Sequence, residues 1–85
     1  MSTDIKSSKT SRPNKGAIEW KAVGRRIRHL RGFDMTQEEF ARRIGVSQGH
    51  FSYMERGEKE IGADILLRIS EEFEKSIEWL LTGKE

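Results

Sequence analysis

The sequence contains no cysteine, a single proline, only two histidines and no long apolar run. Without cysteine, neither a disulfide framework nor a thiolate zinc site can hold the fold together, and two histidines make a poor metal shell. No segment approaches the roughly 20 apolar residues of a membrane span, and the first ten residues are polar where a secretory signal would be apolar. We therefore expect a cytoplasmic protein without a membrane segment, metal or cofactor.

The chain is short and strongly charged, with 85 residues, of which 35% are charged and 34% are apolar. This length allows one small domain, and the apolar content is sufficient for a compact core. The sequence shows no nucleophile–base pair, metal set or phosphate loop, and its few carboxylates fit solvated helix faces. These absences argue against an enzyme.

Charge is distributed unevenly along the chain. Residues 1–16 carry four basic residues and one acid, and residues 21–56 carry eight basic residues and four acids. Residues 57–85 reverse the sign, with four basic residues and eight acids. This polarity favours a nucleic-acid partner over a small acidic substrate, although ordinary solvated faces explain the charge equally well.

Residues 1–16 show no apolar periodicity and are rich in Ser, Thr and basic residues. This composition predicts a disordered basic arm in front of one domain over residues 17–85. The arm has the charge to contact a minor groove or phosphates, and a terminal tail without such a role is an equal alternative.

Three apolar stripes with spacings of three and four predict helices. The first covers about residues 20–31 and ends at Gly32, the second covers 65–73, and the third covers 77–81 behind the capping residue Ser76. The sequence shows no strand pattern and no internal repeat, which indicates an all-α fold. The residues that define the stripes are Trp20, Val23, Ile27, Leu30, Ile65, Leu66, Ile69, Phe73, Ile77, Trp79, Leu80 and Leu81.

Between the first two stripes lies a segment with the signals of two short helices. Thr36 and Glu39 have the spacing of a capping box, and Met35 can pack on Phe40 as a hydrophobic staple. Gly45 is placed to end this helix. Ser47 caps the next, which runs to about Arg56 with Val46 packing on Phe51, and a link as short as Gly45–Val46 requires a steep crossing, as in a helix-turn-helix.

From Val23 to Leu81 the sequence resembles the Xre/Cro-type helix-turn-helix family of phage and bacterial transcriptional repressors. The resemblance implies a compact, all-α, lambda-repressor-like domain of five helices with a central helix-turn-helix. It rests on Ile27, Leu30, Arg31, Met35, Thr36, Gln37, Glu38, Glu39, Phe40, Ala41, Ile44, Gly45, Val46, Ser47, Phe51, Glu55, Gly57, Leu66, Ile69, Trp79 and Leu80.

The third helix is the expected reading element. With Phe51 and Met54 directed inward, a rotation of 100° per residue places Gly49, Ser52, Tyr53 and Arg56 on the opposite face. In similar proteins the start of this helix enters the major groove, and an exposed glutamine there suits adenine. The resemblance therefore assigns base contacts to Gln48, Gly49, Ser52 and Tyr53, although Gly49 offers no side chain for reading.

The family pattern also implies phosphate contacts and one structural ion pair. Gln37 matches a residue that clamps a phosphate beside a helix N-terminus. His50 lies to one side of the reading face, where a backbone contact and simple exposure are equal alternatives. Arg31 and Glu55 match a pair that joins the first and third helices. The full set of expected phosphate contacts is Gln37, Ser47, His50, Arg56 and Lys59.

Two departures from the family pattern stand out. The connection from Leu30 to Gln37 is one residue shorter than usual, so the first turn is expected to differ. Glu74 and Lys75 replace the usual glycine and small apolar residue before the last helix, and we therefore expect the fourth helix to run on.

The resulting hypothesis is a sequence-specific regulator of transcription, a repressor that binds double-stranded DNA as a homodimer on a two-fold operator. Trp79 is a candidate dimer contact. The alternative is a protein-interaction module, such as the antitoxin of a toxin–antitoxin pair or a bridging co-regulator, which docks a protein partner through the acidic half or the Trp79 end.

Overall fold

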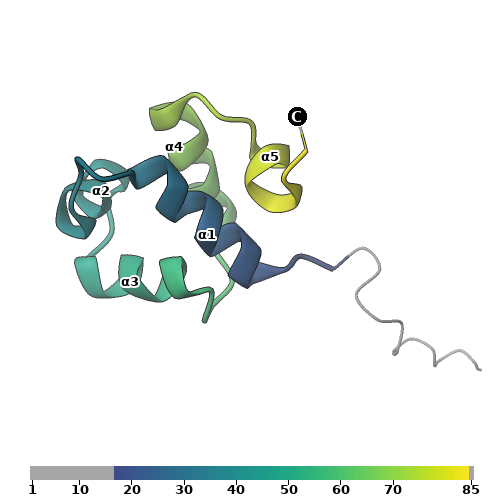
Figure 1. The fold of residues 1–85 in the computed structure, drawn as a ribbon, viewed down its shortest axis with the longest axis horizontal. Helices are drawn as coiled ribbons and strands as arrows, with labels where there is room; N and C mark the ends of the chain where they lie inside the picture. The colour runs from purple at the N-terminus through teal and green to yellow at the C-terminus, as the bar shows by residue number, and fades with distance from the viewer. Residues whose placement is uncertain (1–16, 85) are drawn as a thin grey trace, which may run out of the picture.

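The computed structural model describes residues 17–84, so the predicted basic arm over residues 1–16 lies outside the described part. Five α-helices and no strand occupy the described residues, as the sequence predicts (Figure 1). The helices are α1 (Trp20–Arg31), α2 (Gln37–Ile44), α3 (Gln48–Arg56), α4 (Ala63–Phe73) and α5 (Ile77–Thr82). None of them is long and apolar enough to cross a membrane.

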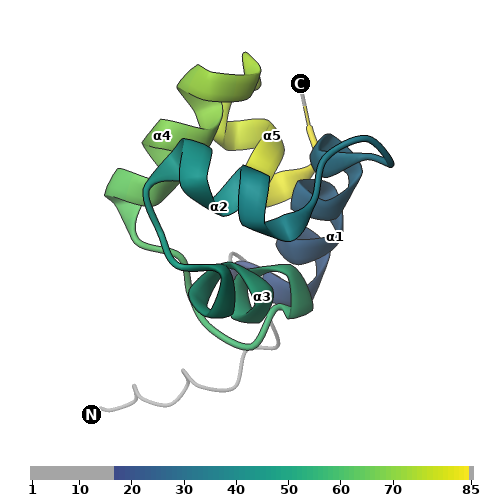
Figure 2. The same ribbon diagram turned by 90° about the vertical axis from the view of Figure 1, so that its left-hand side faces the viewer.

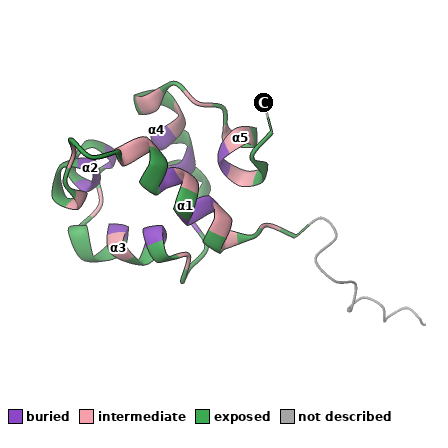
Figure 3. Cartoon of the chain, in the orientation of Figure 1, coloured by how far each residue is buried: buried purple, intermediate pink, exposed green. Residues whose placement is uncertain are grey.

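A stack of three phenylalanine rings organises the core. Phe40 of α2 lies between Phe51 of α3, at 4.6 Å between ring centroids, and Phe73 of α4, at 4.4 Å. Offset stacks of this kind add to the free energy gained by burying the rings. Every helix contributes buried apolar side chains to this core (Figure 3). The fully buried members besides the rings include Val23, Ile27, Met54, Ile69 and Leu80.

The central helix-turn-helix forms through the local signals seen in the sequence. The Thr36 hydroxyl accepts a hydrogen bond from the Glu39 N–H at 3.0 Å, and the Glu39 carboxylate accepts one from the Thr36 N–H at 2.9 Å. Gly45 ends α2 with a left-handed backbone, at φ 79°. The Ser47 hydroxyl then caps α3 by accepting from the His50 N–H. Figure 2 shows α3 nearly end-on beneath α2.

Helix α1 crosses α3 in direct backbone contact at Gly24. A Cβ atom there would lie 2.4 Å from the carbonyl oxygen of Glu55 and 2.8 Å from that of Met54. Only glycine permits this approach without displacing one helix. Gly24 therefore sets the distance between α1 and α3, and nothing in the local sequence pattern identified it.

The prediction that the fourth helix runs on is wrong. Helix α4 ends at Phe73, because Glu74 adopts a left-handed backbone at φ 56° and its N–H bonds to the Ser70 carbonyl. Glu74 is the one non-glycine residue with positive φ in the described chain. The reversal keeps Phe73 in the ring stack and lets Ser76 cap α5 through the Trp79 N–H, at 2.9 Å.

Gly24→Ala should destabilise the domain by about 3 kcal/mol, because the added methyl group overpacks a backbone contact that cannot repack. Urea unfolding followed by circular dichroism measures the change. Gly49→Ala is the matched control, since a Cβ at Gly49 meets nothing within 4 Å and alanine favours the helix. Equal stability of the two variants would contradict the backbone contact.

Glu74→Gly should stabilise the domain by about 1 kcal/mol, because glycine adopts the left-handed conformation without steric cost. A thermal melt should show a higher Tm. Glu71→Gly, an identical exchange inside α4, should lower the Tm instead, since glycine weakens a helix interior. A lower Tm for Glu74→Gly would show that the carboxylate or stem of Glu74 outweighs the backbone strain.

Candidate nucleic-acid interface

Helix α3 exposes one face along its length. Phe51, Met54 and Glu55 are buried, whereas Tyr53 and Arg56 are exposed (Figure 3). This face points away from α4 and α5, at the lower edge of Figure 1. The residues expected to read bases therefore lie on accessible surface: Gln48, Gly49 and Tyr53 are exposed, and Ser52 is half-buried.

Behind this face, Glu55 is the one charged residue that the described chain buries. Its carboxylate accepts from Arg31 twice, with Nε–Oε2 at 2.6 Å and Nη2–Oε1 at 3.2 Å. Arg31 also donates to the Met35 carbonyl at 3.1 Å. A bidentate, almost dry pair of this kind holds both side chains in one geometry. The pair links α1, the turn before α2, and α3.

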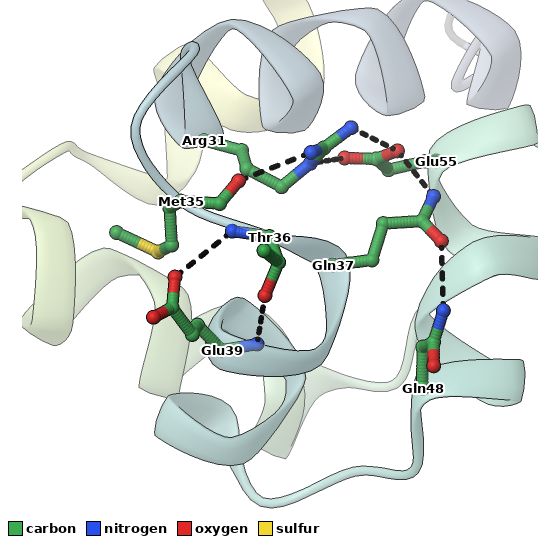
Figure 4. Close-up of polar contacts among 7 residues, drawn as sticks. All are labelled: Arg31, Met35, Thr36, Gln37, Glu39, Gln48 and Glu55. Carbon is green, nitrogen blue, oxygen red and sulfur yellow. Dashed lines mark hydrogen bonds and ion pairs between the residues drawn. The ribbon is translucent and has the colours of Figure 1, made fainter.

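Gln37 and Gln48 extend this pair to the surface (Figure 4). The Gln37 Nε2 donates to Glu55 Oε1 at 2.9 Å, and the Gln48 Nε2 donates to Gln37 Oε1 at 3.4 Å. An ionised carboxylate only accepts hydrogen bonds, so Gln37 must turn its NH2 group toward Glu55 and its oxygen toward Gln48. The buried charge thereby orients the half-buried amide of Gln37, whose oxygen accepts from Gln48 on the exposed face of α3.

A second cluster surrounds Arg56 at the other end of α3. Arg56 donates to the Glu58 carboxylate at 2.9 and 3.4 Å and to the Ser52 hydroxyl. The Tyr53 ring lies 5.0 Å from the Arg56 guanidinium carbon and 5.6 Å from the Lys59 ammonium. The hydrogen bond from Arg56 lowers the pKa of Glu58 below its usual value. Four members of this cluster are residues expected to contact DNA. The fifth, Glu58, is an acid that the sequence analysis did not single out. The four are Ser52, Tyr53, Arg56 and Lys59.

The other expected phosphate contacts lie at the N-terminus of α3. The Ser47 hydroxyl already serves as the helix cap, through the His50 N–H at 3.1 Å. His50 itself is exposed. Helix N-termini favour anions because their first N–H groups lack partners within the helix.

Sequence reasoning missed two features of this half of the domain. Glu58 follows the glycine that ends α3, and no periodic pattern marks such a loop residue. Phe33 is fully exposed on the turn between α1 and α2, which is the turn that was expected to differ. Within residues 17–84, no three metal-ligating side chains come together.

Comparison with known proteins gives consistent matches. A family model described as helix-turn-helix matches residues 27–80. The P22 c2 repressor, solved in complex with a synthetic operator, is 33% identical with a TM-score of 0.68. That alignment covers 73% of this chain and 96% of the repressor chain. No curated protein sequence matched.

Two further solved structures align with the domain. The clp gene regulator ClgR from Corynebacterium glutamicum is 28% identical, with a TM-score of 0.66 and coverage of 80% of this chain and 71% of its own. SinR, a master regulator for biofilm formation solved with DNA, is 25% identical, with a TM-score of 0.61 and coverage of 68% and 95%. Since the family model spans more than half of the sequence, the chain belongs to the Xre/Cro-type helix-turn-helix family of DNA-binding transcriptional regulators.

Proposed function

We propose that this regulator is a sequence-specific repressor that binds a two-fold operator as a homodimer, with α3 in the major groove. The observation that carries the proposal is the oriented amide of Gln48 on the exposed face of α3, held by Gln37 and the buried Glu55. The P22 c2 repressor, which shares this fold at 33% identity, was solved on a synthetic operator.

Base reading is assigned to one short strip of α3. Gln48 makes a bidentate amide contact with adenine, and the hydrogen bond that it donates to Gln37 limits the orientations it has to lose on binding. Gly49 carries no side chain and allows the helix to approach the base edges closely. Ser52 and Tyr53 complete the strip, with the Tyr53 ring suited to a thymine methyl group.

Sequence-independent affinity comes from contacts on both sides of this strip. Gln37 and the helix N-terminus bearing Ser47 and His50 face one stretch of phosphates, and Arg56 and Lys59 face another. Such contacts fix the register of α3 on the duplex and release counterions.

A homodimer accounts for a two-fold operator, because each half-site then receives one α3. We assign the dimer contact to the Trp79 end of the domain. Trp79 is only partly buried, and the Lys75 ammonium lies 4.7 Å from the centre of its ring.

The second candidate is a protein-interaction module. The observation that favours it is Phe33, which is fully exposed beside Arg25, Arg28 and His29 at the surface of α1. In this alternative, the Phe33 ring and the basic side chains around it form the contact with the partner.

We expect the chain to bind random duplex DNA with an affinity whose logarithm falls steeply and linearly with the logarithm of salt concentration. DNA from upstream of its own gene should outcompete the random duplex. Fluorescence anisotropy over a salt series measures both. If neither duplex binds at low salt, DNA binding is refuted and the interaction module replaces it.

Gln48→Ala should abolish the preference for upstream DNA, with a loss of about 1–3 kcal/mol, roughly 5- to 150-fold, and leave random-duplex affinity unchanged. Gln37→Ala should weaken binding to both duplexes, because it removes a phosphate contact and the support of Gln48. Competition anisotropy separates the two patterns. A preserved preference in Gln48→Ala would exclude this residue from base reading.

A further inference from the structure

Glu58 occupies an unusual place for an acidic residue in a DNA-binding domain. It follows Gly57 in the loop after α3, and this loop extends on the same side as the exposed face of α3 (Figure 1). Its side chain is 44% exposed. In a complex with α3 in the major groove, this carboxylate lies near phosphates, where its charge is repelled.

The carboxylate engages the cation that is best placed to bind those phosphates. Arg56 Nε and Nη2 both donate to Glu58, and Nη1 donates to the Ser52 hydroxyl. These bonds use three of the five N–H donors of the guanidinium, including both donors of the fork formed by Nε and Nη2. Glu58 takes the fork formed by Nε and Nη2, so a phosphate can use this fork only by displacing Glu58, and the carboxylate offsets the charge of Arg56 as long as it stays.

We propose that Glu58 is an affinity-limiting residue that holds Arg56 away from phosphates and so restrains sequence-independent DNA binding. This inference rests on the proposed function. The loop residue competes directly with the DNA backbone for one guanidinium. Weak non-specific binding matters to a regulator because its site competes with a vast excess of other DNA.

A purely structural role for the pair is the weaker explanation. Both side chains are about half exposed, at 50% for Arg56 and 44% for Glu58, and ion pairs with such exposure contribute little to stability. The backbone of the turn has its own hydrogen bonds: the Gly57 N–H bonds to the Met54 carbonyl, and the Glu58 N–H bonds to the Tyr53 carbonyl, each at 3.1 Å. The loop therefore keeps its conformation without the Glu58 carboxylate.

The test measures affinity for a random-sequence duplex by fluorescence anisotropy over a salt series, with the full chain. Glu58→Gln should bind about 5-fold more tightly than the parent chain at low salt, and its log–log salt slope should be steeper by about one. The glutamine keeps the size of the side chain. Circular dichroism should give an unchanged Tm.

Glu72→Gln is the matched control. Glu72 is also an exposed glutamate paired with an arginine, Arg43, at 4.0 Å, and it lies on α4, away from the exposed face of α3. The control should leave affinity within about 2-fold, because the removed charge is beyond the reach of the phosphates at moderate salt. An equal gain in both variants would reduce the effect to net charge and overturn the proposal.

A double-mutant cycle tests whether Glu58 acts through Arg56. Arg56→Gln should bind more weakly than the parent chain, and Arg56→Gln with Glu58→Gln should gain less than 2-fold over Arg56→Gln alone. A full 5-fold gain in the absence of Arg56 would show direct repulsion instead and overturn the proposal.

Failure of this proposal is distinguishable from failure of the proposed function. If the parent chain binds duplex DNA and Glu58→Gln binds equally well, Glu58 has no such role although the DNA-binding function stands. If neither chain binds at low salt, DNA binding itself is refuted, and this inference falls with it.

Discussion

The buried carboxylate of Glu55 determines how α1, α2 and α3 are arranged. Taking a charge out of water is costly unless the charge is paired and hydrogen-bonded. Arg31 from α1 and Gln37 from α2 supply these donors to a residue of α3. Three helices therefore meet in one arrangement, because any other would leave the charge without partners.

Backbone packing between α1 and α3 supports the same arrangement. At Gly24 the backbone of α1 touches the carbonyl groups of Met54 and Glu55, so the two helices cannot approach further or rotate freely. The Phe40 stack then joins α2 to α3 and α4. Packing sets the distances between the helices, and the polar contacts of Glu55 set their orientation. Together they present α3 as a rigid, one-sided surface.

Much of the fold was predictable because its signals are local. Capping residues such as Thr36 and Ser47 act within three residues of themselves, and they place the starts of α2 and α3 correctly. The apolar stripe also stops at Phe73, but the left-handed backbone of Glu74 was not predictable, because it accompanies the packing of Phe73 on Phe40, about thirty positions away in the chain. Gly24 could not be identified for the same reason, since the carbonyl groups that it contacts, those of Met54 and Glu55, are about thirty positions away.

The expected site residues also divide into those that local helical periodicity places and those whose contacts depend on another part of the chain. Helical periodicity alone places Gln48 and Tyr53 on the exposed face of α3, so their accessibility followed from the sequence. The contacts of Arg56 with Glu58 and Ser52 depend on the path of the loop after α3, which no periodic pattern specifies. The division of these residues into base and phosphate contacts came from the family resemblance, because solvent exposure alone does not distinguish the two kinds of contact.

The hydrogen-bonded series from Arg31 to Gln48 also has a consequence for how such a regulator diversifies. Gln48 and Gly49 are exposed at the outer end of this series, so new side chains there should leave the fold intact, and under the proposed function they would alter recognition. Gln37 donates directly to the buried carboxylate, so changes there would affect folding and, under the proposed function, recognition as well. We therefore expect relatives with different operator preferences to differ first at the start of α3. Arg31, Gln37 and Glu55 should change less, because they also hold the three helices together.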